Sequence, residues 1–395
     1  MTSELDQSIR KLGDGSIVGL DTGETVFRLD SYEYNPIIKP QDLGLVWHEN
    51  ERLHSGAVFN GGAELFENKV ILLPRCHQNY RKSAFFDRKL RIERTRLENY
   101  ISEVWPLEST NGVNFSRIGT IVIRGDGKLH KDFAHGIEDI RIIKINDRYF
   151  LIGCGKVRPA FTASNADRIA IYSTRNIYDM KYHGIVESFD SRNAVPFPEK
   201  VSQKLYMLFR FDSNIYLDHL EGAVDQLLYP AKYGRAWDRV FERRTQNLLL
   251  KAGDLPHEKE KIGPGAQLIK TGKGWLLIYH AVGFLDENIC QAYRIPQNIE
   301  RGYSICAAIL DINEPGNVIC RTSRPIYIPS APYELYGNEE YPVDVPAVVF
   351  PVGAITRDGK LVIYAGAGDK YIILLSCDLS NLIDYLWQYC RCEDG

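Results

Sequence analysis

The chain reads Lys69-Val-Ile-Leu-Leu-Pro-Arg75, and four later segments repeat its pattern of a turn residue, five apolar or aromatic residues and a distinctive seventh residue. These segments are Arg148-Tyr-Phe-Leu-Ile-Gly-Cys154, Lys204-Leu-Tyr-Met-Leu-Phe-Arg210, Gly274-Trp-Leu-Leu-Ile-Tyr-His280 and Lys360-Leu-Val-Ile-Tyr-Ala-Gly366. They recur at intervals of roughly 55 to 85 residues, which predicts a modular architecture. Each run is too short for a buried helix and is rich in β-branched and aromatic residues. We therefore interpret each as a strand buried on both faces.

Further apolar segments lie close to these strands in the sequence and are expected to pair with them. They are residues 116–124, 167–173, 303–311 and 371–378. Turn residues such as Asp358-Gly359 separate strand from neighbour. A hairpin-like pair repeated five times predicts an all-β fold, a five-bladed β-propeller, whose radial packing leaves few open edges.

The remaining segments predict additions to this propeller. Residues 1–34 are polar and are expected to form an N-terminal arm, disordered or bound to a neighbouring subunit, with the propeller domain covering 35–378. The charged insertion 81–104 carries apolar residues at near-helical spacing, so we expect a helix or a long solvated hairpin. Residues 379–395 are expected to contain a short C-terminal helix.

Composition excludes several classes of function. The 395 residues are 44% hydrophobic and 25% charged, which is ordinary for a globular protein. The net charge of −3 gives no basic field for nucleic acid or an anionic membrane. The sequence has no apolar run of membrane-spanning length. The arm and the insertion are compatible with a homo-oligomer.

Eight cysteines are scattered through the chain without CxxC or Cys/His metal spacing. The first residues lack the apolar region of a signal peptide. We therefore expect free thiols, a cytoplasmic location, and neither a bound metal nor an organic cofactor.

Gly136-Ile-Glu-Asp-Ile-Arg141 is the strongest catalytic candidate. In a regularly alternating strand Asp139 and Arg141 would share one face and Glu138 would take the other. An aspartate beside an arginine is either an acid oriented for chemistry or a structural ion pair, and both interpretations stay open.

Three further clusters accompany it. In 190–200, Arg192-Asn193 combines a planar cationic fork with a neutral donor, which suits an oxyanion or sugar hydroxyls, although a rigid loop with a solvated arginine fits equally. Lys261-Ile-Gly-Pro-Gly265 permits close backbone approach to a ligand. Ala365-Gly-Ala-Gly-Asp-Lys370 lacks the helix and Gly-Lys-Ser/Thr of a phosphate loop, so a turn near the propeller axis is favoured.

All of these clusters lie on, or beside, the inner strand of a repeat. We therefore predict one axial pocket that contains two carboxylates, Asp139 and Asp369, and a larger set of basic groups. Such an excess of basic groups is typical of a site for a small dianion. The expected basic residues are Arg75, Arg192, Arg210, Lys261 and His280.

Several motifs together carry a resemblance to a known family. They are Phe59-Asn60, Leu73-Pro-Arg75, Ser116-Arg-Ile-Gly119, Gly136-Ile-Glu-Asp-Ile-Arg141, Arg192-Asn193, Phe197-Pro-Glu-Lys200, Lys270-Thr271, Gly274-Trp-Leu-Leu-Ile-Tyr-His280, Ala307-Ala-Ile-Leu-Asp311, Val349-Phe350 and Gly353-Ala354. From about residue 35 to residue 378 the chain resembles glycoside hydrolase family 130, which contains mannoside phosphorylases and some β-mannosidases on a five-bladed β-propeller. The segment 76–115 is longer than in most members and would border the leaving-group side.

The resemblance implies inverting phosphorolysis of β-1,2- or β-1,4-manno-oligosaccharides by inorganic phosphate, giving α-mannose 1-phosphate. It implies that Asp139 is the catalytic acid and delivers its proton through a mannose hydroxyl. The positions implied to bind phosphate are Arg192, Asn193, Arg210, Lys261, His280 and Tyr303. The positions implied to surround the mannose ring are Asn60, Arg75, Glu138, Arg141 and Asp369.

Physical reasoning favours a phosphorylase over a hydrolase. An inverting hydrolase needs one carboxylic acid and one carboxylate base that activates water. Phosphate is already a nucleophile, so a phosphorylase needs one acid and a set of cations that holds the anion.

Three alternatives remain open. An inverting β-mannosidase on the same fold could use Glu199, Glu138 or Asp369 as its base. An arabinanase-like glycosidase would need three acidic groups and would leave the basic set without a use. A non-catalytic sugar-binding propeller would bind mannosides without turnover.

Overall fold

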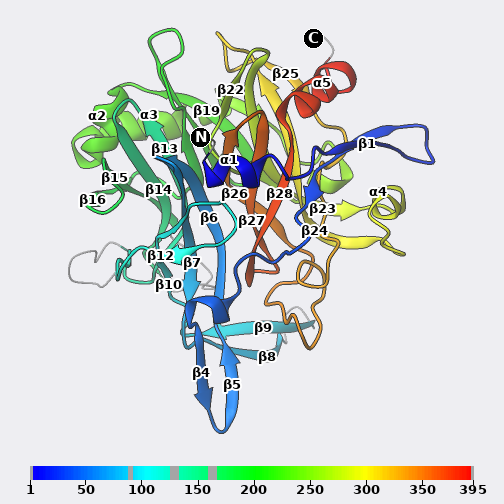
Figure 1. Ribbon diagram of the computed structural model, residues 1–395. Coiled ribbons are helices and arrows are strands. Elements are labelled where there is room, and N and C mark those ends of the chain that lie inside the picture. The colour runs from blue at the N-terminus through cyan, green and yellow to red at the C-terminus, as the bar shows by residue number, and fades with distance from the viewer. Residues whose placement is uncertain (1–2, 88–91, 125–132, 159–166, 393–395) are drawn as a thin grey trace.

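Five β-sheets of four or five strands each surround a common axis in the computed structural model, which confirms the predicted five-bladed β-propeller (Figure 1). The structure describes residues 3–87, 92–124, 133–158 and 167–392. The first blade contains β6 (Ala57–Phe66), β7 (Lys69–His77), β10 (Ser102–Val104), β11 (Leu107–Ser109) and β12 (Ser116–Arg117). The second contains β13 (Ile137–Ile145), β14 (Arg148–Lys156), β15 (Asp167–Thr174) and β16 (Lys181–Ile185).

The other three blades follow the same antiparallel order. The third contains β17 (Arg192–Pro196), β18 (Leu205–Phe211), β19 (Asn214–Leu220) and β20 (Leu248–Leu250). The fourth contains β21 (Lys261–Pro264), β22 (Ile269–Thr271), β23 (Gly274–Leu285), β24 (Ile299–Leu310) and β25 (Val318–Arg321). The fifth contains β26 (Val349–Arg357), β27 (Lys360–Ala367), β28 (Tyr371–Asp378) and β3 (Asp30–Ser31).

The five repeated segments are the second strands of the five blades, β7, β14, β18, β23 and β27. Their apolar residues are almost entirely buried, because each strand has a neighbour on both edges and a packed layer on both faces. The innermost strands pack against one another around the axis: β6 contacts both β13 and β26, and β17 contacts β13 and β21. The ends of the innermost strands therefore meet at the axis.

The N-terminal segment is folded onto its own propeller, not extended as a free or exchanged arm. α1 (Glu4–Ile9) buries Leu5 and Ile9 in the core shared by the first and fifth blades. The hairpin of β1 (Ser16–Gly19) and β2 (Thr25–Arg28) follows, and β3 then pairs with β28. The fifth blade thus combines strands from both parts of the chain, and this pairing closes the ring.

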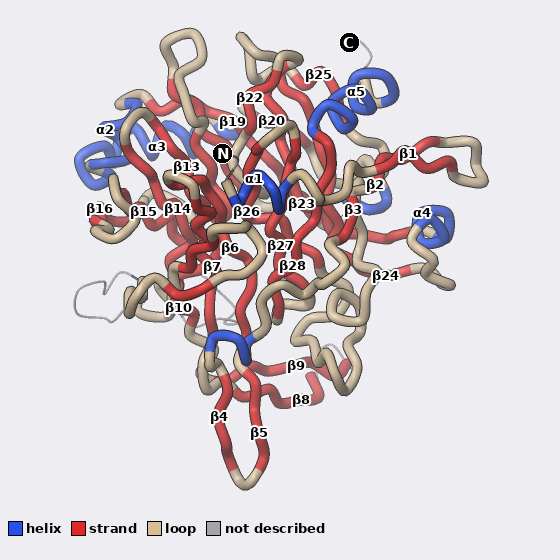
Figure 2. Tube along the Cα trace, in the orientation of Figure 1, coloured by secondary structure: helices blue, strands red, loops and turns tan. Residues whose placement is uncertain are grey.

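The charged insertion forms a hairpin and not the helix that its spacing allowed. β8 (Arg81–Asp87) pairs with β9 (Ile92–Glu98) in an antiparallel two-stranded ribbon. Residues 88–91 of the insertion lie outside the described part of the chain. A second hairpin, β4 (Val46–Glu49) with β5 (Arg52–Ser55), projects beside it (Figure 2).

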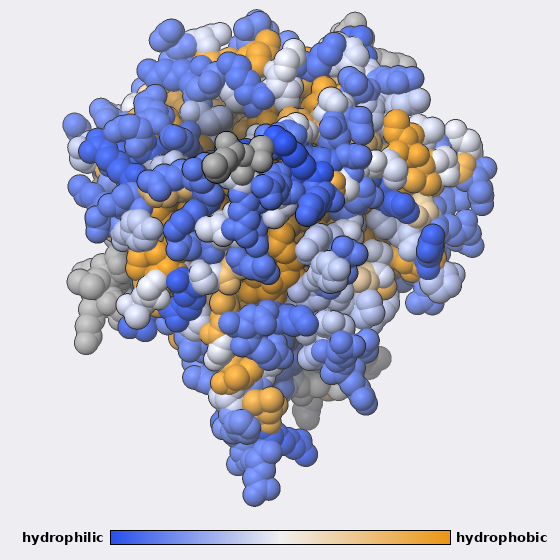
Figure 3. Space-filling view, in the orientation of Figure 1, coloured by the Kyte–Doolittle hydropathy of each residue, from blue (hydrophilic) through white to orange (hydrophobic). Residues whose placement is uncertain are grey.

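Short helices complete the molecule. α2 (Ala223–Leu228) and α3 (Gly234–Glu242) lie between β19 and β20 and bury Trp237 against the third blade; neither helix was predicted from the sequence. α4 (Glu287–Ala292) lies between β23 and β24, and α5 (Leu379–Tyr389) lies in the C-terminal segment expected to be helical. The face in Figure 3 is mainly hydrophilic, with small apolar areas between the blades. None of the helices in the described ranges has the length and apolar character needed to cross a membrane.

Candidate active site

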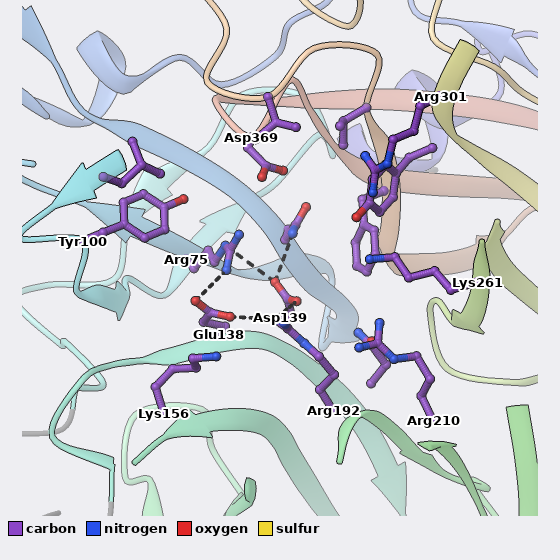
Figure 4. Close-up of a pocket in the computed structure, with 17 residues that line it drawn as sticks. Arg75, Tyr100, Glu138, Asp139, Lys156, Arg192, Arg210, Lys261, Arg301 and Asp369 are labelled. Carbon is purple, nitrogen blue, oxygen red and sulfur yellow. Dashed lines mark hydrogen bonds and ion pairs between the residues drawn. The ribbon is translucent and has the colours of Figure 1, made fainter. Parts of the chain in front are cut away.

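A cavity of about 330 Å³ opens where the innermost strands converge (Figure 4). All five blades contribute to it. Its lining consists of Asn60, Arg75, Leu97, Tyr100, Glu138, Asp139, Lys156, Arg192, Asn193, Arg210, Lys261, Arg301, Tyr303, Val345, Val348, Phe350 and Asp369.

Three innermost strands carry a β-bulge where they reach this cavity. The register shifts fall between Phe59 and Gly62, between Glu138 and Arg141, and between Arg192 and Val195. Each shift contains one residue with a positive φ: Asn60 at 53°, Asp139 at 51° and Asn193 at 58°. Asparagine and aspartate tolerate this left-handed conformation better than other side chains. A bulge re-aims the side chain, so it directs a polar group from each strand into the site.

The bulge in β13 also corrects an expectation. Regular alternation would have placed Glu138 and Asp139 on opposite faces. Instead both carboxylates lie in the cavity and contact the same two arginines, because the extra residue of the bulge breaks the two-residue period.

Glu138 is held between Arg75 and Arg192. Its two oxygens lie 3.0 Å from Arg75 Nη1 and 2.6 Å from Arg192 Nη2. Burial opposes ionisation of Glu138, but the two guanidinium groups outweigh that effect and lower its pKa. Glu138 is therefore an anion that positions both arginines. Because both of its oxygens are engaged, it is poorly placed to activate water.

Asp139 has a different environment. The side-chain amide of Asn60 donates a hydrogen bond of 3.0 Å to Asp139 Oδ1. Arg75 Nε lies 3.6 Å from Oδ1 and Arg192 Nη2 lies 3.5 Å from Oδ2. Asp139 is only 3% exposed, yet it lines the cavity. Its carboxyl group is thus oriented by one short hydrogen bond while its two cationic contacts are long.

Cations gather at the other end of the cavity. Lys261 Nζ and the Arg301 guanidinium lie 5.1 Å and 5.2 Å from the centre of the Tyr303 ring, and Arg210 lies beside them (Figure 4). Arg301 is held by Glu260, with N–O distances of 2.6 and 2.8 Å. The described lining contains six cationic side chains and three carboxylates, so the cavity carries an excess of positive charge.

Asn193 also lines the cavity, and its buried side-chain amide has no hydrogen-bond partner in the part of the chain that the structure describes. Neither its Nδ2 nor its Oδ1 has a hydrogen-bond partner among the described residues. Unpaired buried amides are costly, and one that lines a cavity is typical of a ligand-binding position. A ligand with both donor and acceptor groups would satisfy it.

Two of the expected site residues, Arg141 and His280, lie behind the cavity wall and are not part of its lining. Arg141 donates hydrogen bonds to three main-chain oxygens, those of Asp139 at 2.7 Å, Pro264 at 3.0 Å and Gly265 at 2.9 Å. It therefore links the second blade to the fourth beneath the site.

His280 is fully buried, with its ring centre 4.3 Å from that of Phe350. Burial, together with nearby Arg210 and Lys261, lowers its pKa well below the usual range, so the ring is neutral. The remaining expected site residues all line the cavity.

Asp369 comes from the turn between β27 and β28. Burial raises its pKa to about 6; Arg75 opposes the shift, while Asp139 and Asp344 add to it. Its φ of 51° places it in the same left-handed region as Asn60 and Asp139.

Several residues that line the cavity were not predicted from the sequence. Lys156 pairs with Asp167, and Arg301 lies on β24. Lys156 and Arg301 are isolated charged residues that belong to no sequence motif. Leu97 and Tyr100 come from the insertion, whose position depends on tertiary contacts. In these cases the local sequence carried no signal that could have identified them.

A buried group outside the cavity has the composition of a metal site. Candidate ligand atoms of His257, Glu258 and Cys306 lie within 4.8 Å of one another. However, Glu258 already accepts a 2.7 Å hydrogen bond from the Tyr279 hydroxyl and pairs with Arg321. The adjacent guanidinium disfavours a cation, so we interpret this group as a structural network.

A match to one protein-family model over most of the chain establishes the family. Residues 32–388 match the model of a family described as beta-1,4-mannooligosaccharide phosphorylase. The chain belongs to glycoside hydrolase family 130. Its relatives in that family include a 1,2-beta-oligomannan phosphorylase of Thermoanaerobacter, which is 26% identical over 80% of this chain and 97% of the relative.

Two more comparisons agree with this family. A beta-1,2-mannobiose phosphorylase of Thermoanaerobacter is 27% identical over 88% of this chain and 96% of the relative. The solved structure of the Listeria innocua beta-1,2-mannobiose phosphorylase, in complex with beta-1,2-mannobiose, shares the fold. It has a TM-score of 0.65 and 22% identity, and covers 91% of this chain and 99% of that one.

Proposed function

We propose that this protein catalyses inverting phosphorolysis of a β-mannoside, with inorganic phosphate as co-substrate and α-mannose 1-phosphate as product. The observation that carries the proposal is the division of the cavity. Asp139 is oriented by Asn60, and Arg210, Lys261 and Arg301 lie together on one side of Asp139 (Figure 4). Asn193 adds an unpaired buried amide to the same cavity. An acid beside a group of cations that can hold an anion matches the two requirements of phosphorolysis.

The residues have separate roles in this proposal. Arg192, Asn193, Arg210, Lys261 and Tyr303 bind phosphate, and His280 supports them from behind the wall. Phosphate attacks C1 of the mannosyl unit, and the bond from C1 to the leaving oxygen breaks. Asp139 supplies the proton that this oxygen gains, by way of a mannose hydroxyl as in the family that the chain resembles.

The mannose ring is bound by Asn60, Arg75 and Asp369. Glu138 and Arg141 contribute indirectly: Glu138 fixes Arg75 and Arg192, and Arg141 fixes the bulge that carries Asp139.

The geometry gives less support to a hydrolase. Glu199, one candidate base, lies on the surface and pairs with Lys270, away from the cavity. Glu138, a second candidate, has both oxygens engaged by arginines. Asp369 is the third candidate base. A hydrolase that used it would still leave the cationic side chains of the cavity without a function, because water, unlike phosphate, carries no charge for them to bind.

We propose a β-1,2-mannoside as the first substrate to test. The family model is described by the β-1,4 activity, whereas the relatives reported above are named for β-1,2-linked substrates. The eight unpaired cysteines, seven of them buried, fit a reducing compartment and support the expected cytoplasmic location.

The decisive experiment incubates the protein with β-1,2- and β-1,4-mannobiose, with and without inorganic phosphate, and follows the products by ¹H and ³¹P NMR. We expect α-mannose 1-phosphate in the presence of phosphate, and no mannose in its absence. Asp139→Asn should lower the phosphorolysis rate by about 100- to 10,000-fold, the range for loss of a general acid, while Glu199→Gln on the surface should leave it unchanged.

Equal release of mannose with and without phosphate would establish a hydrolase instead. Binding without turnover of either disaccharide would favour a sugar-binding propeller.

A further inference from the structure

The β8–β9 insertion contributes two residues to the cavity wall, Leu97 at the end of β9 and Tyr100 just after it. We propose that Tyr100, assisted by Leu97, is the platform for the leaving sugar and determines which acceptor the enzyme accepts. The proposal rests on the phosphorylase function above and specifies its second sugar site.

Their position supports this role. Tyr100 lies on the Arg75 side of Asp139, whereas Arg210, Lys261 and Arg301 lie on the other side (Figure 4). In an inverting displacement the nucleophile and the leaving group occupy opposite faces of the reacting carbon. If phosphate is held by the cationic end, the leaving sugar extends toward Tyr100 and Leu97.

Tyr100 is fixed in the manner of a binding platform. Its ring stacks on that of His77, with centres 3.8 Å apart and an angle of 15° between the planes, and it meets Tyr80 edge-on at 5.3 Å. A rigid aromatic ring loses little conformational entropy on binding and offers apolar area together with a polar hydroxyl. These properties match a neutral pyranose, which presents C–H groups on one face and hydroxyls at its edge.

The insertion and the adjoining Tyr80 are anchored to the segment around Asp344. The Tyr80 hydroxyl bonds to Asp344 and accepts a 2.8 Å hydrogen bond from Lys370 Nζ. Lys82 Nζ donates to the main-chain oxygens of Val343 and Asp344, at 3.1 and 3.0 Å. The segment after Asp344 supplies two apolar wall residues, Val345 and Val348. These anchors therefore fix the insertion, and with it Leu97 and Tyr100, against the segment that follows Asp344.

The test uses the synthetic direction, where donor and acceptor are varied separately. In this direction the acceptor hydroxyl oxygen forms a bond to C1 of α-mannose 1-phosphate, and the bond from C1 to the phosphate oxygen breaks. The proton lost by the acceptor hydroxyl ends on the released phosphate. Initial rates of phosphate release are measured with mannose, mannobiose, glucose and N-acetylglucosamine as acceptors, for the full-length wild type and its variants.

We expect Tyr100→Ala to raise the KM of the preferred acceptor by about tenfold, equivalent to roughly 1.4 kcal/mol of lost contact, with the donor KM little changed. Tyr100→Phe keeps the ring and should resemble the wild type. Leu97→Ala should produce a smaller increase in acceptor KM. Tyr229→Ala, at a tyrosine that is 55% exposed and outside the cavity lining, is the matched control.

An equal rise in both KM values, or none, would overturn the proposal. Should Tyr100→Ala lower the melting temperature too far for kinetics, Leu97→Ala decides the question by the same comparison of acceptor and donor. Failure of the wild type to use phosphate with any mannoside would be a different result, since it would overturn the phosphorylase function itself.

Discussion

Asp369 shares the cavity with Asp139 and Glu138, and three carboxylates in a small buried volume carry an electrostatic cost. Glu138 avoids that cost through two arginines, and Asp139 receives a hydrogen bond from Asn60. Asp369 has weaker compensation, and its pKa is raised to about 6 by burial. Its ionisation at neutral pH therefore destabilises the free protein.

The stability of Asp369→Asn relative to the wild type should depend on pH in a defined direction. The pKa of Asp369 rises from 3.8 in the unfolded chain to about 6 in the folded one, so its favourable contribution is complete below pH 4 and is lost as pH rises through 6. Above pH 7 the cost is about 3 kcal/mol. We expect Asp369→Asn to unfold at a higher temperature than the wild type at pH 7.5, and the difference to shrink toward pH 5.

Thermal unfolding in phosphate-free buffers across this pH range measures the effect. A difference that grows as pH falls would contradict the assigned direction. Sugar binding by the variant should be weaker, because the carboxylate is one of the proposed mannose contacts.

At the scale of single elements, the bulged inner strands turn a repetitive scaffold into a site. The bulges at Asn60 and Asp139 need space, and glycines on a neighbouring blade provide it. A Cβ on Gly366 of β27 would lie 2.0 Å from Asn60 Oδ1, and one on Gly62 would lie 2.3 Å from the main-chain oxygen of Ile140. Side chains at these two positions would displace the strands that carry Asn60 and Asp139.

Gly366→Ala should therefore impair catalysis more than folding. The added methyl group would push the Asn60 amide away from Asp139, and we expect kcat/KM to fall by at least about tenfold, with a stability loss of about 1–3 kcal/mol. Gly272→Ala, where nothing lies within 4 Å of the added Cβ, is the matched control and should change neither quantity.

Steady-state kinetics and thermal unfolding of both variants provide the comparison. Wild-type activity in Gly366→Ala would show that the site does not require this close approach of β27 to Asn60.

At the scale of the whole molecule, the N-terminal segment closes the ring. β3 supplies an edge strand to the fifth blade, and α1 inserts Leu5 into the core between the first and fifth blades. Arg357 on β26 pairs with Asp6 at 2.8 Å, which adds a polar contact to this closure. The segment is thus part of the propeller's stability, although it lies outside the cavity lining.

Leu5→Ala should lower the melting temperature and leave the activity below the transition unchanged. Leu5 is fully buried, and a leucine-to-alanine change at such a site costs about 2–5 kcal/mol. Ile17→Ala, in the same segment but at a side chain that is 51% exposed, should shift stability by less than about 0.5 kcal/mol.

Differential scanning calorimetry of the two variants distinguishes them. If Leu5→Ala lowered the melting temperature as little as Ile17→Ala, α1 would not contribute to ring closure. The first and fifth blades would then hold together without it.

The number of blades and most of the cavity could be predicted from the sequence alone. Strand patterning is local: five runs of apolar residues between turn signals predict five central strands, and these strands converge whatever their connections. Arg75 and Arg210, the seventh residues of two repeats, lie in the cavity for that reason. The family motifs then pointed to Asp139 and to most of the other residues that line it.

The direction of individual side chains and the conformation of the insertion could not be predicted from local sequence, because contacts between distant segments fix them. The bulge at Asp139 reversed the alternation that would have separated it from Glu138, because its register is set by pairing with β14. The insertion had near-helical spacing but forms a hairpin, and its Lys82 is anchored at Asp344, more than 250 residues away in the chain. Arg141 lies two residues after Asp139 and His280 ends a repeated strand segment, yet packing places both behind the cavity wall. Contacts between distant segments fix these features, and such contacts leave no periodic signal in the sequence.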